Sequence, residues 1–566
     1  MAMKEKILLF DNSIERKISV AEKKAEQGEF EKTLSLLFSI ENYDKNASVL
    51  MDIADAYADM GLLELSNTYW FKYLDVASKD KQSVAFEELA INYFYLEDFW
   101  ASSYYFHKKI DADGFISKEG IDQEILDFFA GEEHKKAFYH IAYPFDRADY
   151  SGKIKMAKHF IATGKFSEAI KVLTLIPKEC MNDDGYGDLA TAYYMNDELD
   201  NSAMVSRESL SVHGDNVTAY CNLCVVYDMK KDSEKSEYYY QEALKCRTGE
   251  RTEAYKIVTC AIERDDHVTT KECLIKILAD RQFDVNMRFF YGLACINLGE
   301  YDLAEKELQR VYRINVNDVV VKYYCDLVSK LKNGCKNSQN LLPLRYVREV
   351  PKKEEKHREK LIKKLAEHTE NISSAIKQPS VRQILLWGLR CREIETARQT
   401  AFVLASSFNP FSKKAMKDVL LDSEALPELK RLVVFALTVR GYNKSYGVVA
   451  GSVYIKVKPK KISFAEHDEN GMFEKAYALA TSRVVFWGFD KLDKLVVSAE
   501  KIFKKLNGVV TNSDVTIDEI ASLMVYKSEF EKLKSKQLVA QLFDVKIDRF
   551  NALLVNLLGE KKDENN

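Results

Sequence analysis

Apolar residues recur at helical spacing along most of the chain, and small residues recur among them at longer, regular intervals. In YGLACINLGEYDLAEKELQRV, residues 291–311, Gly292 and Ala304 lie twelve positions apart between aromatic and aliphatic side chains. Earlier copies of the first small position, Ala190, Cys224 and Val258, precede Gly292 in steps of 34 residues. This periodicity predicts pairs of helices that repeat along the chain.

Two glycines stand where helix is otherwise predicted, although glycine inside a helix costs about 1 kcal/mol relative to alanine. We expect Gly292 and Ala304 to lie where two helices cross, because small side chains let the helices approach closely. We expect Gly299 to end the first helix in a left-handed conformation. Since no helix pair could bury its apolar face alone, stacking of successive pairs should form the core.

Nine such units run from about residue 14 to residue 316, and a closing helix is predicted to end near residue 333. The residues that fit a known repeat pattern in the clearest unit are Tyr291, Gly292, Gly299, Tyr301, Ala304, Leu308 and Val311. Residues 14–333 therefore resemble the tetratricopeptide repeat (TPR) family. The resemblance implies a right-handed α-solenoid whose first helices line a concave groove for a peptide or protein. The predicted fold class is mainly all-α: about nine helix-turn-helix repeats, followed by an irregular helical C-terminal module with a small β-hairpin.

The resemblance also places residues in the groove, with apolar and aromatic side chains and few charges. Such a surface suits an extended or helical peptide, although the same side chains could instead pack between units. A clamp for a terminal carboxylate is disfavoured, because Gly187 and Thr191 stand where that clamp needs lysine and asparagine. The predicted partner-binding residues are Tyr194, Met195, Asp228, Met229, Tyr255, Phe289, Ile296 and Asn297.

Charge divides the chain unevenly. Residues 341–566 contain 40 basic and 29 acidic residues, a net charge of +11, whereas the whole chain carries −4. This asymmetry predicts different partners for the two parts. The predicted domains are a TPR solenoid over 1–340, a charged helical linker over 341–378, irregular helical pairs over 379–440 and a C-terminal module over 441–566. Within that module, the alternation in YGVVAGSVYIKVK, residues 446–458, predicts a β-hairpin.

The stretch SKQLVAQLFDVKIDRFNALLVNLL, residues 535–558, resembles a helix-turn-helix motif. The resemblance implies contact with DNA or RNA through Lys546, Arg549 and Asn551. Asp544 stands where that motif usually has glycine, and the second helix soon becomes apolar. A helical cap without a nucleic-acid partner is the other interpretation.

No pattern for catalysis is legible in the sequence. Cys221 and Cys224 have the spacing of half a zinc site, but no second pair is placed to complete it, so we expect them to pack in the core. We therefore predict no enzyme, no catalytic residue, no cofactor and no metal. Ten scattered cysteines and the lack of a long apolar run predict a cytoplasmic protein with no membrane partner.

Three hypotheses for the function follow. The leading one is a non-catalytic scaffold or adaptor that binds a peptide or protein segment in the concave TPR groove. The alternative is a nucleic-acid-binding regulator, whose basic C-terminal module contacts DNA or RNA while the TPR array senses a partner. A third interpretation is that the acidic array and the basic module dock on each other and occupy the groove.

Overall fold

The computed structural model describes residues 14–114, 121–132, 154–506 and 515–558 of the chain. Within these ranges it leaves out residues 155, 159, 162–163, 179–180, 215, 247–250, 392, 461, 463–470, 487–491 and 531–535. The chain divides into two compact units: residues 1–141 together with 352–566, and residues 142–351. The predicted domain boundaries at residues 340, 378 and 440 stay predictions.

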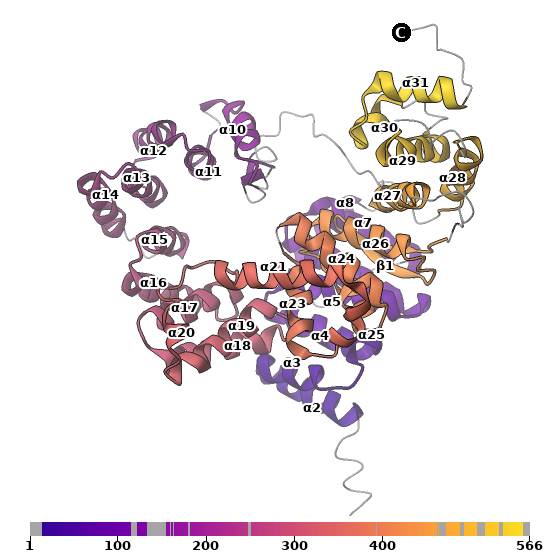
Figure 1. Cartoon of the computed structure of the whole chain (residues 1–566). Coiled ribbons are helices and arrows are strands. Elements are labelled where there is room, and N and C mark those ends of the chain that lie inside the picture. The colour runs from indigo at the N-terminus through magenta and orange to yellow at the C-terminus, as the bar shows by residue number, and fades with distance from the viewer. Residues whose placement is uncertain are drawn as a thin grey trace, which may run out of the picture. The chain divides into compact units, whose positions relative to one another are not determined.

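The first unit begins with helix pairs, which Figure 1 shows in indigo and violet. In each pair a first helix is followed by a second helix that packs on it. The helices are α2 (Ile14–Glu26), α3 (Phe30–Phe38), α4 (Ala47–Asp59), α5 (Leu63–Val76), α6 (Gln82–Tyr95), α7 (Phe99–Asp113) and α8 (Gln123–Glu132). One of the nine predicted units is a degenerate copy with Ile125, Phe128, Ala137 and Ile141. It begins in α8, and Ala137 and Ile141 lie outside the described residues.

The C-terminal part of this unit is also mainly helical. Its helices are α21 (Lys352–Glu367), α22 (Ile372–Ala375), α23 (Pro379–Gly388), α24 (Ile394–Ser407), α25 (Pro410–Leu421), α26 (Pro427–Val439), α27 (Met472–Phe486), α28 (Asp493–Leu506), α29 (Ile517–Val525), α30 (Lys536–Leu542) and α31 (Ile547–Leu558). Strands β1 (Tyr446–Ala450) and β2 (Val453–Val457) pair antiparallel, with Val448 opposite Ile455. The predicted hairpin is confirmed, and Gly451 takes the positive φ of its turn.

The charged segment after residue 351 forms a packed helix. Ile362 and Leu365 of α21 are buried, and this helix packs on α24. Arg358 is also buried, with its guanidinium over the ring of Trp387. One face of α21 therefore belongs to the core of the first unit.

Within the first unit, the second helix α5 docks on the C-terminal part. The carboxylate of Asp75 forms ion pairs of 2.7 Å with Lys417 and 2.6 Å with Lys456. Burial raises the pKa of Asp75, but the two ammonium groups outweigh that effect and hold it below the ordinary value. The hydroxyl of Tyr105 on α7 donates to the carbonyl of Ser452, 2.8 Å away. Residues of α5 and α7 thus contact the C-terminal part within this unit, and Asp44, just before α4, pairs with Lys414 at 3.1 Å.

The second unit contains the clearest repeats. Its helices are α10 (Phe166–Thr174), α11 (Asp183–Met195), α12 (Leu199–His213), α13 (Val217–Met229), α14 (Ser233–Lys245), α15 (Arg251–Glu263), α16 (His267–Asp280), α17 (Val285–Asn297), α18 (Tyr301–Ile314), α19 (Val319–Lys332) and α20 (Lys336–Gln339). The first helices begin at N-caps spaced by multiples of 34 residues, Asn182, Asn216, Asp284 and Asp318, and each cap side chain accepts a backbone N–H.

The first helices also end alike. Residues with positive φ follow them at Asp197, Lys231, Asp265 and Gly299, again in steps of 34 residues. A Cβ on Gly292 would lie 2.8 Å from Cγ of Leu308, so the helices of that pair do cross at the glycine. The roles expected for Gly292 and Gly299 are confirmed, and so are the all-α class and its helical repeats.

Candidate functional site

The first helices share one position, two residues before the recurring small residue. We call the residues at this position the row. They are Asp52 in α4, Glu88 in α6, Asp188 in α11, Asn222 in α13, Lys256 in α15, Phe290 in α17 and Tyr324 in α19. Equivalent positions in stacked repeats face the same way, so the row marks one face of each array, the first-helix face.

In the second unit, part of the first-helix face is already covered by the chain itself. Residues 342–350, LPLRYVREV, follow α20 and have no helix or strand. We call this stretch the strap. Leu344, Tyr346 and Val350 are buried, whereas Arg345 and Val347 between them are exposed. Alternate residues therefore face α17 and α19, as in an extended peptide bound to a surface.

Asn297, at the end of α17, holds the backbone of the strap. Its side-chain Nδ2 donates to the carbonyl of Leu344 at 2.8 Å, and the Leu344 N–H donates to its Oδ1 at 2.7 Å. One amide side chain thus pairs with both polar groups of one residue, as a neighbouring strand would. Tyr324, a member of the row, donates its hydroxyl to the carbonyl of Glu349, 2.9 Å away.

Two side chains of the strap make the other contacts. The Tyr346 hydroxyl lies 3.0 Å from Nδ1 of His267, and its ring meets the edge of Phe290, another row residue. Arg348 donates to Asn286 and forms an ion pair with Asp318. Both side chains are therefore recognised by aromatic, polar and acidic groups together.

The predicted partner-binding residues fall into three groups. Met195 and Met229 are exposed, at 49% and 55%. Asp228 is exposed as well, and Tyr194 and Tyr255 are half-buried. Phe289 and Ile296 are fully buried, and the Arg348 guanidinium lies over the ring of Phe289. Asn297 contacts the strap directly, so the chain's own segment uses one of the predicted residues.

Acidic residues occupy the row in the first array. Desolvation raises the pKa of Asp52 to about 6, with a further contribution from Glu22. Asp55, one turn further along α4, has its pKa raised to about 7 by desolvation and by the charges of Glu88, Asp52 and Asp59. These carboxylates repel one another, and within the described part of the chain no positive group lowers the pKa of Asp52 or Asp55.

The row in the second unit continues with polar groups. The pKa of Asp188 is raised to about 6, since desolvation outweighs the charges of Lys158 and Lys256. Its Oδ2 and the Nδ2 of Asn222 are buried, and neither has a hydrogen-bond partner within the described part of the chain. Asn222 holds in α13 the position that Tyr324, which bonds to the strap, holds in α19.

The residues predicted to contact nucleic acid lie on α31 and the turn before it. Asp544 has a φ of 55°, so it takes the left-handed conformation of the expected glycine. Arg549 forms an ion pair of 2.9 Å with Glu519 of α29, which ties its charge to the supporting helix. Lys546 and Asn551 are exposed.

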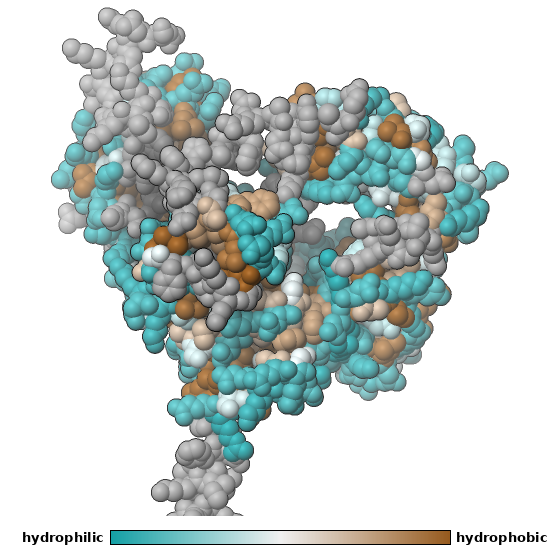
Figure 2. All heavy atoms as spheres, turned by 180° about the vertical axis from the view of Figure 1, so that it is seen from behind, coloured by the Kyte–Doolittle hydropathy of each residue, from teal (hydrophilic) through white to brown (hydrophobic). Residues whose placement is uncertain are grey.

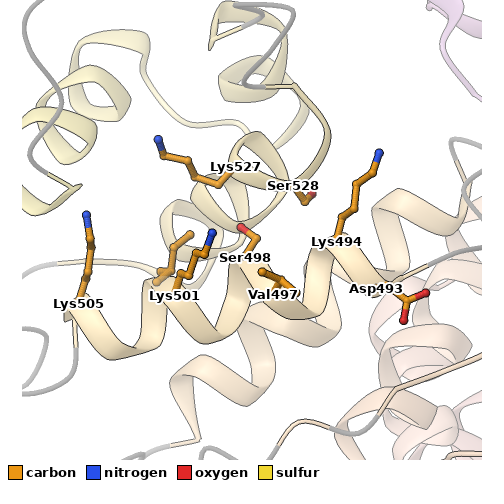
Figure 3. Close-up of a pocket in the computed structure, with 9 residues that line it drawn as sticks. Asp493, Lys494, Val497, Ser498, Lys501, Lys505, Lys527 and Ser528 are labelled. Atoms are coloured by element: carbon orange, nitrogen blue, oxygen red, sulfur yellow. The ribbon is translucent and has the colours of Figure 1, made fainter.

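A separate group of lysines lines a hollow of about 550 Å³ on the first unit, between α28 and the π-helical turn Tyr526–Phe530. Figure 3 shows Lys494, Lys501 and Lys505 along α28, with Lys527 from the turn that faces it. Asp493 at one end pairs with Lys460 at 2.7 Å. We call this feature the basic hollow; its charges suit an anion.

Most of the cysteines that the structure describes are buried. Cys221 and Cys224 are buried in a cluster of apolar side chains that includes Cys260 and Cys273. Among the described residues, no three His, Cys, Asp or Glu side chains are grouped to hold a metal ion. None of the described helices is long and apolar enough to cross a bilayer. On the face shown in Figure 2, hydrophilic residues predominate, with apolar residues between them.

Comparison with known proteins adds little to this geometry. No family model matches the sequence, and no curated protein does. Among solved structures, the chain is similar to the "Crystal structure of APC/C hetero-tetramer Cut9-Hcn1" at 14% identity, over 76% of this chain and 85% of that chain. The TM-score is 0.28, which is too low for an argument. The assignment of the fold therefore rests on the repeated caps, turns and crossings of the helix pairs. The arrays have a tetratricopeptide-like fold.

Sequence reasoning missed two parts of the TPR-like site. It overlooked the acidic row residues Asp52 and Glu88, although they stand two positions before the small residues Ala54 and Ala90. It also interpreted residues around Pro343 only as a boundary. Leu344, Tyr346 and Val350 stand at even spacing, but apolar Val347 and charged Arg348 break the alternation, so the sequence offered only a weak signal for the strap.

Proposed function

We propose that the protein is a non-catalytic scaffold that binds extended segments of partner proteins on the first-helix faces of its TPR-like arrays. The observation that carries this proposal is the paired hydrogen bonding of Asn297 to Leu344. In these bonds a side chain of a first helix pairs with the extended backbone of the strap, which supports the proposal. Contacts of this kind give affinity without a catalytic group, and the side chains between them give selectivity.

The charges of the row suggest the chemistry of the partner. Asp52, Asp55 and Glu88 gather in the first array, and Asp188 continues the acidic row in the second unit. Lysine or arginine side chains of a bound segment would relieve the repulsion among these carboxylates. We therefore propose that the face formed by α4 and α6 prefers an extended segment that is basic and partly apolar.

The test uses two labelled peptides with alternating residues, one of leucine and arginine and one of leucine and glutamate. Fluorescence anisotropy should show that the full-length chain binds the basic peptide at least roughly tenfold more tightly. The triple variant D52N/D55N/E88Q should lose that preference. The matched control E41Q/D111N/E124Q removes the same charge from exposed positions of the same array and should keep it. Equal binding of both peptides by the wild type would contradict the proposal.

A second candidate is an anionic partner, including DNA or RNA, for the basic C-terminal part. The basic hollow favours it, because four lysines line one surface. Binding to duplex and single-stranded nucleic acid should then weaken as salt rises. Loss of binding in K501E/K505E would place the contact at the basic hollow, and loss in K546E would place it on α31. No binding at low salt would exclude this candidate.

A further inference from the structure

The strap has the properties of a bound ligand more than those of a core element. From Pro343 to Val350, its backbone makes a single hydrogen bond to another backbone group within the described chain, from the Val347 N–H to the carbonyl of Arg345. Its other backbone contacts go to the side chains of Asn297 and Tyr324. Core segments satisfy their backbone in helices or sheets, whereas peptides on a surface rely on side chains of the receptor.

The strap also has a regular pattern of inward-facing side chains. Its inward residues are Leu344, Tyr346, Arg348 and Val350, at every second position. Two of these side chains have specific partners on the array. His267 and Phe290 contact the Tyr346 ring, and Asp318 pairs with Arg348. Burial raises the pKa of Tyr346 to about 12, so its phenol stays protonated and hydrogen-bonded. A site that hydrogen-bonds a phenol and pairs a guanidinium rejects segments that lack them.

We propose that α16, α17 and α19 form a selective site for an extended segment of the pattern Leu-X-Tyr-X-Arg, and that the strap fills this site in cis until a partner segment of the same pattern replaces it. The inference rests on the proposed function and adds the sequence class of the partner for one part of the first-helix face. It differs from the acidic face of α4 and α6, which would bind its own basic segment independently.

Because the strap is covalently linked to the array, it weakens the apparent affinity of any competing partner segment. A tethered segment has an effective concentration in the millimolar range when its linkers are short. A partner segment with a dissociation constant of about 10–100 μM for the empty site would therefore bind the wild-type chain roughly 10–100-fold more weakly. Only a partner that gains further contacts elsewhere on the array would replace the strap at low concentration.

The experiment uses full-length chains and a labelled nonapeptide of the strap sequence, LPLRYVREV. The variant Y346A/R348A removes two inward side chains of the strap and leaves the site intact. It should bind the nonapeptide roughly 10–100-fold more tightly than the wild type does. The matched control R345A/V347A changes two outward residues and should bind like the wild type. A scrambled peptide of the same composition should bind neither variant.

Two further measurements keep the outcome decisive. Adding N297A to Y346A/R348A should abolish the gained binding, because the strap's backbone partner is lost. In the wild type, excess nonapeptide should speed hydrogen exchange of the Leu344 amide, which Asn297 normally protects. If the opened variant does not bind and the amide stays protected, the strap is a fixed structural part and the inference is wrong. The proposed function is judged separately, by the leucine–arginine peptide on the acidic face.

Discussion

Lys456 of β2 donates to Asp75 of α5, although the two residues are 381 positions apart in the chain. The distance between Nζ and the carboxylate oxygen is 2.6 Å, and Asp75 is almost fully buried. A residue of the N-terminal array thus anchors the β-hairpin of the C-terminal part within one compact unit. The opposite charges predicted from the sequence meet here through a second helix.

The first prediction concerns that anchor. Asp75→Asn should destabilise the first unit by about 1–3 kcal/mol, since two charge-assisted hydrogen bonds are lost. The pKa of Asp75 is lowered in the folded chain, so its stabilisation is present above the unfolded pKa and is lost as pH falls through the folded value. Urea unfolding at pH 7 and pH 3 measures both effects. The difference between variant and wild type should shrink at pH 3, and a constant difference would contradict the ion-pair interpretation.

The exposed Asp111 on α7 provides the control for Asp75. Asp111→Asn makes the same chemical change without removing a buried ion pair, so the free energy of unfolding should change by less than about 0.5 kcal/mol. Hydrogen exchange in β1 and β2 should rise for the Asp75 variant only.

The second prediction concerns Arg288 and Glu307, which form an ion pair between α17 and α18 with both side chains buried. Arg288→Met should destabilise the second unit by about 2–4 kcal/mol, because the buried Glu307 loses its close partner and keeps only Arg310, 3.7 Å away. The double variant R288M/E307L should recover most of this loss, since two apolar side chains of similar size replace the pair. Urea unfolding measures the stability of the single and double variants, and hydrogen exchange in α17 and α18 shows whether the change lies in these helices. A double variant as unstable as the single one would refute the argument.

The third prediction separates the two roles of glycine. Gly292→Ala should cost about 1–3 kcal/mol, because the new Cβ would lie 2.8 Å from Cγ of the buried Leu308. Gly299→Ala should cost about 1 kcal/mol, since it meets open space but must hold a φ of 77°. Leu308→Ala should partly suppress the first loss and not the second. Additive losses for Gly292 and Leu308 in a double-mutant cycle would refute the crossing.

The repeats were predictable because their determinants are local. Caps, turns and small residues recur at fixed spacing, so each copy supports the assignment of the next. The strap was not predictable in this way, since Leu344 meets Asn297 across 47 positions and Tyr346 meets His267 across 79. Its contacts depend on how the whole array stacks. The same reason hid the bond between Lys456 and Asp75. Asn297 was among the predicted groove residues because its place in the repeat is set locally, and its role toward a partner stays a prediction.

The fourth prediction asks whether Asp55 is retained for binding. Desolvation and neighbouring carboxylates raise its pKa to about 7 in the folded chain, so the folded state holds this proton at pH values where the unfolded state has lost it. Stability from this group therefore falls as pH rises from about 4 to 7. Asp55→Asn should raise the free energy of unfolding at pH 8 by about 1 kcal/mol or less and change it little at pH 4. The gain is small because water still reaches part of the side chain.

The same substitution should weaken binding of the leucine–arginine peptide at pH 8, since a carboxylate that faces the bound cation is lost. Stability and affinity would then change in opposite directions, which is the signature of a charge kept for a partner at a cost in stability. In the wild type, affinity for the same peptide should rise between pH 5.5 and 8 as Asp52 and Asp55 lose their protons. A variant that gains stability at pH 8 but binds the peptide as tightly as the wild type would show that Asp55 does not contact the partner.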